Sequence, residues 1–239
     1  MSPLVVFAYN FPHKKTVDVL LHLFAHGYTV GWVLAADPVP LSIPPPTIRT
    51  KITHYVPLHP RTVAERLGAR YVVAPHNSQL VEELLSEVRP DLGVIAGARI
   101  LKGYVISKFR IGIVNLHPGL LPEVRGLDAM LWSIYKDVPL GVTAHLIDES
   151  VDAGRLLLRE EIPIFADDTL LDLSERLYDY QLKLLAPALE AAMRGDWIPF
   201  QVAALPPPNK KMPPELERQV VGKLEKYKKR FALVEGKML

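Results

Sequence analysis

Residues 111–122 read Ile-Gly-Ile-Val-Asn-Leu-His-Pro-Gly-Leu-Leu-Pro, an apolar run that ends abruptly in polar residues and turn formers. The run Ile111–Leu116 predicts a buried β-strand. Asn115 and His117 are two residues apart, so their side chains face the same side of an extended chain. Pro118 fixes the exit from the strand. Two hydrogen-bonding side chains are therefore expected to emerge together at a strand end.

Upstream of this strand, short apolar runs alternate with amphipathic stretches. Strands are expected at Leu4–Ala8, Thr29–Ala36, Tyr71–Ala74 and Leu92–Ala96, and helices at Val17–His26, Thr62–Leu67, from Asn77 or Ser78 to about Val88, and near Ile100–Lys108. This rhythm predicts an α/β fold in which a parallel sheet carries helices on both faces. In such a sheet the ligand crevice lies beyond the C-terminal ends of the strands. Asn115 and His117 are therefore candidate site residues.

Downstream, the pattern continues with two strands and a long helix. The strands are expected at Val142–Ile147 and Arg155–Glu161, and the helix begins at a cap at residues 167–169 and ends at Gly195. This accounts for a single domain that we place at residues 1–197.

The remaining residues, 198–239, predict a short basic tail hinged by prolines. From Pro206 onward the chain has nine Lys and Arg against four Glu, which gives this part a net charge of +5 and leaves −3 for the rest. A basic tail can contact nucleic acid, although lysine-rich C-terminal helices more often only solvate a surface.

The composition excludes several classes of protein. The 239 residues are 49% hydrophobic and 23% charged, which is typical of a globular chain. Cysteine is absent, so disulfides, thiol catalysis and cysteine-ligated metals are excluded, and the eight histidines show no metal-ligand spacing.

No apolar stretch approaches the roughly 20 residues of a membrane span. The N-terminus lacks the charge order of a secretory signal, so we expect a cytoplasmic protein. The 22 prolines and few Asn and Gln indicate a heat-adapted source.

Two clusters carry the candidate chemistry. The amide of Asn115 and the imidazole of His117 can both donate hydrogen bonds to the negative charge that grows on a carbonyl oxygen during acyl transfer. The second cluster, residues 141–154, places His145 on a strand and several acidic residues on the following loop. A carboxylate beside a histidine can hold it protonated or orient a water that moves protons.

Three segments together are similar to the signature of the folate-dependent formyltransferases: Asn115–Pro122, Gly141–His145 and Asp152–Gly154. That family includes glycinamide ribonucleotide, methionyl-tRNA and sugar-nucleotide formyltransferases. The resemblance spans about residues 90–195. It implies a Rossmann-like formyltransferase fold with a mostly parallel twisted sheet, and an enzyme of one-carbon metabolism that uses 10-formyltetrahydrofolate.

The resemblance also implies roles for individual residues. Asn115, His117 and Asp152 match the catalytic asparagine, histidine and aspartate of the family, and His145 matches a histidine near the site that can equally be a hydrogen-bonded core residue. The implied cofactor-binding residues are Arg99, Ile100 and Leu101 on one segment and Asp148, Val151 and Asp152 on the other. Acceptor contacts in the family lie mostly in the N-terminal half and the tail, and the candidate substrate-binding residues are Asn10, His13 and Lys14.

The identity of the acceptor stays open at this stage. Residues 9–15 contain no glycine-rich phosphate loop, which argues against glycinamide ribonucleotide. Methionyl-tRNA formyltransferases add a C-terminal domain of which only the basic tail has a counterpart here. We therefore expect an amine on a small molecule such as an amino-sugar nucleotide or amino acid. The alternatives are a methionyl-tRNA formyltransferase-like enzyme that lacks that domain and contacts tRNA, a non-catalytic folate-binding homologue, and a nucleic-acid-binding protein that uses residues 210–230. A dinucleotide-dependent dehydrogenase is excluded because no Gly-x-Gly-x-x-Gly follows the first strand.

Overall fold

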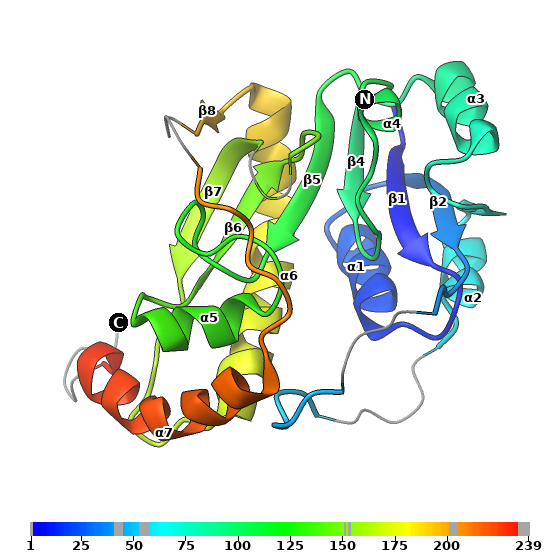
Figure 1. The fold of residues 1–239 in the computed structure, drawn as a ribbon. Helices are drawn as coiled ribbons and strands as arrows, with labels where there is room; N and C mark the ends of the chain where they lie inside the picture. Colours follow the sequence, from blue (N-terminus) through cyan, green and yellow to red (C-terminus); the bar gives the residue numbers. More distant parts are fainter. Residues whose placement is uncertain are drawn as a thin grey trace.

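The computed structural model describes residues 2–40, 45–52, 58–150, 152, 154–200 and 205–233. Within this part of the chain one twisted sheet has the order β3-β2-β1-β4-β5-β6-β7-β8 (Figure 1). The strands are β1 Leu4–Tyr9, β2 Val30–Ala36, β3 Arg70–Val73, β4 Leu92–Ile95, β5 Gly112–His117, β6 Gly141–Leu146, β7 Arg155–Glu161 and β8 Ile198–Pro199.

Helices cover both faces of the sheet, as the alternating pattern predicts. The helices are α1 Lys14–Ala25, α2 Pro60–Arg66, α3 Gln79–Val88, α4 Gly103–Ile106, α5 Ala129–Lys136, α6 Leu170–Arg194 and α7 Pro214–Phe231. The larger core cluster joins one face of β1 to α1, α2 and α6, and the smaller cluster joins the other face to α3 and α4. Strand β1 shows why both faces are covered, because Leu4, Val6 and Ala8 enter the first cluster and Val5 and Phe7 the second.

The parallel part of the sheet is confirmed for β1 to β5, whereas β6, β7 and β8 run antiparallel to their neighbours. The loop from β6 to β7 is too short for a crossover connection, which needs about a dozen residues or more, so these two strands form a hairpin. The sheet is therefore mixed. Strands β1 to β5 have the predicted parallel arrangement, and β6 to β8 do not.

Local signals set the ends of several helices. Ser78 accepts a hydrogen bond from Val81 N at the start of α3, and Thr169 and Asp172 form a capping box at the start of α6. Gly195 ends α6 in the left-handed region, with φ of 79°. The helix α1 begins at Lys14, three residues before the expected start.

Strand β1 is the point at which the chain changes direction across the sheet. It pairs with β2 on one side and with β4 on the other, so the connections leaving these strands diverge. A crevice beyond the C-terminal ends of the strands is expected at such a point. The residues that follow β1, β4 and β5 therefore lie together at the C-terminal edge of the parallel strands.

The basic C-terminal segment is packed against the rest of the molecule. The helix α7 lies along α5 (Figure 1), and Tyr227 is buried in the larger core cluster with its hydroxyl donating to Val138 O at 2.7 Å. Ahead of this helix, Trp132 Nε1 donates to Lys210 O at 3.0 Å. Residues 205–233 thus share a core with the preceding domain, while the division at residue 197 stays a prediction. Among the described residues, no helix is both long and apolar enough to cross a membrane.

Candidate active site

Asn115 and His145 are brought together by the pairing of β5 with β6. The two residues lie directly opposite each other in the antiparallel ladder. Asn115 Nδ2 lies 3.1 Å from His145 Nε2, and because the amide nitrogen can only donate, the imidazole nitrogen accepts. His145 is completely buried, and burial lowers its pKa to about 4 against an opposing effect of the Asp152 carboxylate. A neutral His145 thus holds the carboxamide of Asn115 in place.

His117 is buried and faces an oxygen with each of its ring nitrogens. Nε2 lies 2.7 Å from Val124 O, and Nδ1 lies 3.4 Å from Asp152 Oδ2. Burial lowers the pKa of His117, and Asp152 and the Val124 carbonyl act in the opposite direction. Since both nitrogens can donate only in the cation, these two oxygens specifically favour the imidazolium.

Asp152 connects the two histidines to a neighbouring loop. Its Oδ2 accepts from Gly126 N at 2.8 Å, and its Oδ1 lies 3.7 Å from His145 Nε2. The backbone of Asp152 is left-handed, with φ of 49°. The structure therefore brings together the three predicted catalytic residues, and adds His145 to them as the residue that contacts both Asn115 and Asp152.

The loop that supports Asp152 depends on Gly126, and this gives a stability prediction. Gly126 has φ of 86°, and a Cβ there would lie 2.3 Å from Asn209 O. We expect Gly126→Ala to lower the free energy of unfolding by about 1–2 kcal/mol from the left-handed backbone alone, and by more from the clash. Urea unfolding measures this. Gly222→Ala is the matched control, because Gly222 lies within α7 with open space around it and the change is expected to leave stability equal or higher. Equal stabilities of Gly126→Ala and the wild type would contradict the packing described.

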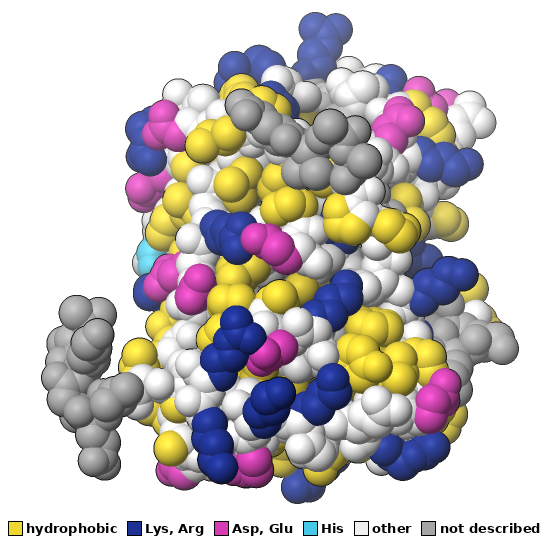
Figure 2. All heavy atoms as spheres, turned by 60° about the vertical axis from the view of Figure 1, so that its left-hand side comes forward, with side chains coloured by type: hydrophobic (Ala, Val, Ile, Leu, Met, Phe, Trp, Pro, Cys, Tyr) yellow, Lys and Arg dark blue, Asp and Glu magenta, His cyan; other side chains and the backbone are white. Residues whose placement is uncertain are grey.

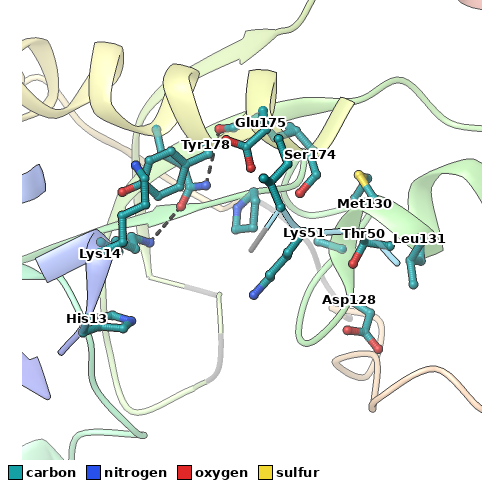
Figure 3. Close-up of a pocket in the computed structure, with 16 residues that line it drawn as sticks. His13, Lys14, Thr50, Lys51, Asp128, Met130, Leu131, Ser174, Glu175 and Tyr178 are labelled. Carbon is teal, nitrogen blue, oxygen red and sulfur yellow. Dashed lines mark hydrogen bonds between the residues drawn. The ribbon is translucent and has the colours of Figure 1, made fainter. Parts of the chain in front are cut away.

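One cavity, which we call the lysine cavity, reaches Pro118, the residue that follows His117 in the chain. It has a volume of about 440 Å³, and Pro118 lies in its wall. The cavity is lined by His13, Lys14, Lys15, Thr50, Lys51, Ile52, Pro118, Asp128, Ala129, Met130, Leu131, Ser174, Glu175, Leu177, Tyr178 and Gln181. Figure 3 shows Lys51 extending into the space between His13 and Asp128.

The lysine cavity contains two of the predicted substrate-binding residues and one that the sequence analysis missed. His13 lines it as a neutral imidazole, because burial and the nearby Lys15 and Lys51 lower its pKa to about 4. Lys14 pairs with Asp18 and lies over the ring of Tyr178.

The missed residue is Lys15. Its Nζ donates to the neutral Gln181 Oε1 at 2.8 Å. Burial and, to a smaller extent, the positive charge of Lys51 lower the pKa of Lys15 to about 8. Its charge also acts to lower the pKa of His117. The Lys14-Lys15 pair was visible in the sequence, but the side that each lysine faces depends on where α1 begins.

A second cavity, which we call the aromatic cavity, has a volume of about 460 Å³ and contains Arg99. It is lined by Tyr9, Phe11, Ala36, Asp37, Pro38, Val39, Pro75, His76, Asn77 and Arg99. Tyr9 stacks on Phe11 with ring centroids 5.2 Å apart, and His13 packs edge-on against Tyr9. Because His13 lines the lysine cavity, this aromatic group forms a partition between the two cavities.

The other predicted binding residues are dispersed. Arg99 donates to Val39 O at 3.3 Å across the aromatic cavity, Ile100 is 67% exposed, and Leu101 is buried in the core. Asp148 lines a different cavity, of about 500 Å³, together with Gly103 and Arg155.

Two predicted positions remain. Val151 lies outside the described residues. Asn10 is not among the described residues that line either the lysine cavity or the aromatic cavity, and its amide donates to Asp37 Oδ1 and accepts from Tyr71 Oη. In the described part of the chain, no group of three or more His, Asp or Glu could hold a metal ion.

Known proteins resemble the chain both in sequence and in fold. The methionyl-tRNA formyltransferase of Fusobacterium nucleatum is 32% identical over 155 residues, which cover 63% of this chain and 49% of that protein. The human trifunctional purine biosynthetic protein adenosine-3 is 34% identical over 142 residues, which cover 55% of this chain and 14% of that protein. The chain thus spans about half the length of the first relative and a small part of the second.

Solved structures confirm the predicted fold class. The phosphoribosylglycinamide formyltransferase of Streptococcus pneumoniae matches with a TM-score of 0.60 and 23% identity, over 81% of this chain and 99% of that one. A sugar N-formyltransferase from a Shewanella species matches with a TM-score of 0.61 and 20% identity, over 93% of this chain and 87% of that one. The model of the formyl transferase family matches residues 57–189, the part that contains Asn115, His117 and Asp152. The chain belongs to the formyl transferase family.

Proposed function

We propose that the protein transfers a formyl group from 10-formyltetrahydrofolate to a primary amine of a small molecule. The observation that carries this proposal is one cluster at the ends of β5 and β6, in which Asn115 contacts His145 and the Asp152 carboxylate lies against both His117 and His145. An amide donor held in place close to an imidazole that a carboxylate supports suits acyl transfer through a tetrahedral oxyanion.

Asn115 contributes a hydrogen-bond donor whose direction is fixed. One hydrogen of Nδ2 is given to His145 Nε2, and the second remains for an oxyanion. A donor that is already oriented loses no reorganisation energy as the charge develops. His145 is therefore a positioning residue for Asn115.

His117 and Asp152 are proposed to take up the proton that the attacking amine loses. The attacking amine must lose a proton, and the buried imidazole with its lowered pKa can accept one at neutral pH. The resulting imidazolium donates to both Val124 O and Asp152 and stands beside the developing oxyanion. Asp152 is held for this role by the Gly126 amide.

The residues of the aromatic cavity fit one end of the proposed cofactor. Tyr9, Phe11 and His76 offer ring faces and edges to a flat aromatic group, and Arg99 offers a cation to an acidic group. When bound, 10-formyltetrahydrofolate supplies the formyl group on an electron-poor nitrogen. We propose Arg99 as the residue that binds its acidic end, while binding roles for Ile100, Leu101, Asp148 and Val151 stay predictions.

The lysine cavity suits the acceptor. Its volume is in the range of small-molecule sites, and Lys15 and Lys51 favour an amine that also has an anionic group. The proposed contacts are with Lys15, Lys51, His13 and Lys14, whereas Asn10 has its amide engaged elsewhere.

A tRNA acceptor is the second candidate, and the surface around α7 is the observation in its favour. On the face shown in Figure 2, Lys and Arg side chains gather in the lower half, where α7 lies, with Asp and Glu between them. Binding to tRNA that weakens steeply as the salt concentration is raised would favour this candidate.

Tight folate binding without formylation of any amine would favour a non-catalytic homologue. A cytoplasmic location and a heat-adapted source stay predictions.

Cofactor binding predicts a change in thermal stability. Saturating 5-formyltetrahydrofolate, a stable analogue, is expected to raise the melting temperature by several degrees, because a ligand that binds only the folded state stabilises it. Arg99→Ala is expected to reduce the shift, and Arg194→Ala, which removes an exposed arginine at the end of α6, is the matched control. Differential scanning fluorimetry measures both. A melting temperature that stays constant up to millimolar folate would contradict the cofactor assignment.

A further inference from the structure

Glu217 of α7 is a buried carboxylate whose hydrogen-bond partners come from two other segments. Its side chain is 1% exposed. Thr47 donates to Oε2 from both its backbone N and its Oγ1, each at 2.7 Å, and Lys211 Nζ donates to Oε1 at 2.8 Å. Burial alone would raise the pKa of Glu217, but Lys211 and Thr47 outweigh that effect and lower it. The carboxylate is therefore ionised at neutral pH and fully engaged.

Thr47 leads directly into a wall of the lysine cavity. Thr50, Lys51 and Ile52 line that cavity, and Lys51 extends into it (Figure 3). The described part of this stretch, residues 45–52, contains no helix or strand, so its position depends on contacts such as those with Glu217.

The same C-terminal segment also holds a second wall of the cavity. Lys211 Nζ lies 3.0 Å from Asp128 Oδ2, which also accepts from Met212 N at 2.7 Å. Asp128 lines the lysine cavity and immediately precedes α5. Lys211 thus bridges the carboxylates of Glu217 and Asp128. Through these contacts, the cavity wall that follows Thr47 and the wall at Asp128 are both held by residues just before and within α7.

We propose that Glu217 is a positioning residue for the acceptor: it fixes Thr47, and through it Lys51, at the lysine cavity, so that α7 sets acceptor affinity without touching the acceptor. The inference rests on the proposed function only in assigning this cavity to the acceptor. It gives the basic C-terminal segment a role in substrate binding that its charge alone does not suggest.

The first test needs no substrate and uses trypsin, which cuts after Arg49 and Lys51. Glu217→Ala is expected to speed cleavage at these two bonds about tenfold to a hundredfold, the scale on which lost hydrogen bonds to a charged group change a local opening equilibrium. Mass spectrometry of the native protein follows each bond. Glu217→Gln is expected to recover most of the protection, because its amide oxygen can still accept from Thr47. Glu225→Ala, which removes an exposed carboxylate of α7, is the matched control and is expected to be cut like the wild type.

The second test is kinetic and uses an acceptor identified by screening amines for formylation. Glu217→Ala is expected to raise KM for the acceptor at least tenfold, with kcat and the melting-temperature shift from 5-formyltetrahydrofolate little changed. If Glu217→Ala does not fold, Thr47→Val, which removes only the hydroxyl donor, is expected to change both readouts in the same direction by a smaller amount.

The proposal is overturned if the folded variants are cut no faster at Arg49 and Lys51 than the wild type. It is also overturned if kcat falls while KM for the acceptor is unchanged. If no amine is formylated, the proposed function fails separately, and the cleavage rates alone decide whether Glu217 holds this wall of the cavity.

Discussion

Replacing Asn115 with alanine is expected to slow formyl transfer by about a hundredfold to a thousandfold, the cost of removing one oxyanion donor, or roughly 2.7–4 kcal/mol. His117→Ala is expected to cost at least as much, because it removes the group that accepts the proton and, with it, the positive charge that then stands beside the oxyanion. Neither side chain lies in the aromatic cavity, so the melting-temperature shift caused by 5-formyltetrahydrofolate is expected to persist in both variants. Single-turnover rates with a saturating amine acceptor measure the loss.

The double variant of Asn115 and His117 provides a sharper test. Both residues act on one transition state, so together they are expected to lose far less than the product of the two single losses. His145→Ala, which leaves Asn115 in place but removes its partner, is expected to give a smaller loss than Asn115→Ala. Strictly multiplicative losses would show that the two side chains do not act as one unit.

Asp152→Asn is expected to lower turnover by about a hundredfold or more, the scale of an acid–base contribution. The amide oxygen can still accept from Gly126 N, so the loop is expected to keep its conformation. Asp167→Asn, at an exposed position before α6, is the matched control and is expected to have wild-type turnover.

The pH dependence of turnover tests the same residue by a second route. Asp152 raises the pKa of His117 against the effect of burial, so its replacement is expected to lower that pKa further. Because neutral His117 accepts the proton, turnover is expected to fall as the pH drops through the pKa of His117, and in Asp152→Asn this fall is expected at a lower pH than in the wild type. Full activity, or an unchanged pH profile, in Asp152→Asn would contradict the role of Asp152.

The central part of the site was predictable because it depends on short-range geometry. Asn115 and His117 lie on one strand at a spacing of two, and any β-strand at that position directs both to the same side. The parallel half of the sheet follows from a strand–helix rhythm that is strong in residues 4–116. The proximity of Asp152 came from the family resemblance, since it depends on how β6 pairs with β5 and on a left-handed backbone at Asp152.

What the sequence did not predict depends on packing between distant segments. Lys15 faces the lysine cavity because α1 begins at Lys14, and helix starts are poorly determined by periodicity. Arg99 and Asp148 lie in different cavities although one binding pocket was expected for both. Glu217 stands in a lysine-rich segment that is typical of a solvated helix, and only the tertiary structure buries its carboxylate against Thr47 and Lys211.

The most direct measurement is a screen for formyl transfer in which the protein, 10-formyltetrahydrofolate and a panel of amines are incubated together and analysed by mass spectrometry. The panel includes amino-sugar nucleotides, amino acids, phosphorylated amines and methionyl-tRNA, and Asp152→Asn serves as the negative control. We predict that at least one small amine with an anionic group gains the mass of one formyl group with the wild type, and far more slowly with Asp152→Asn. Folate binding without formylation of any amine, or equal formylation by both proteins, would contradict it.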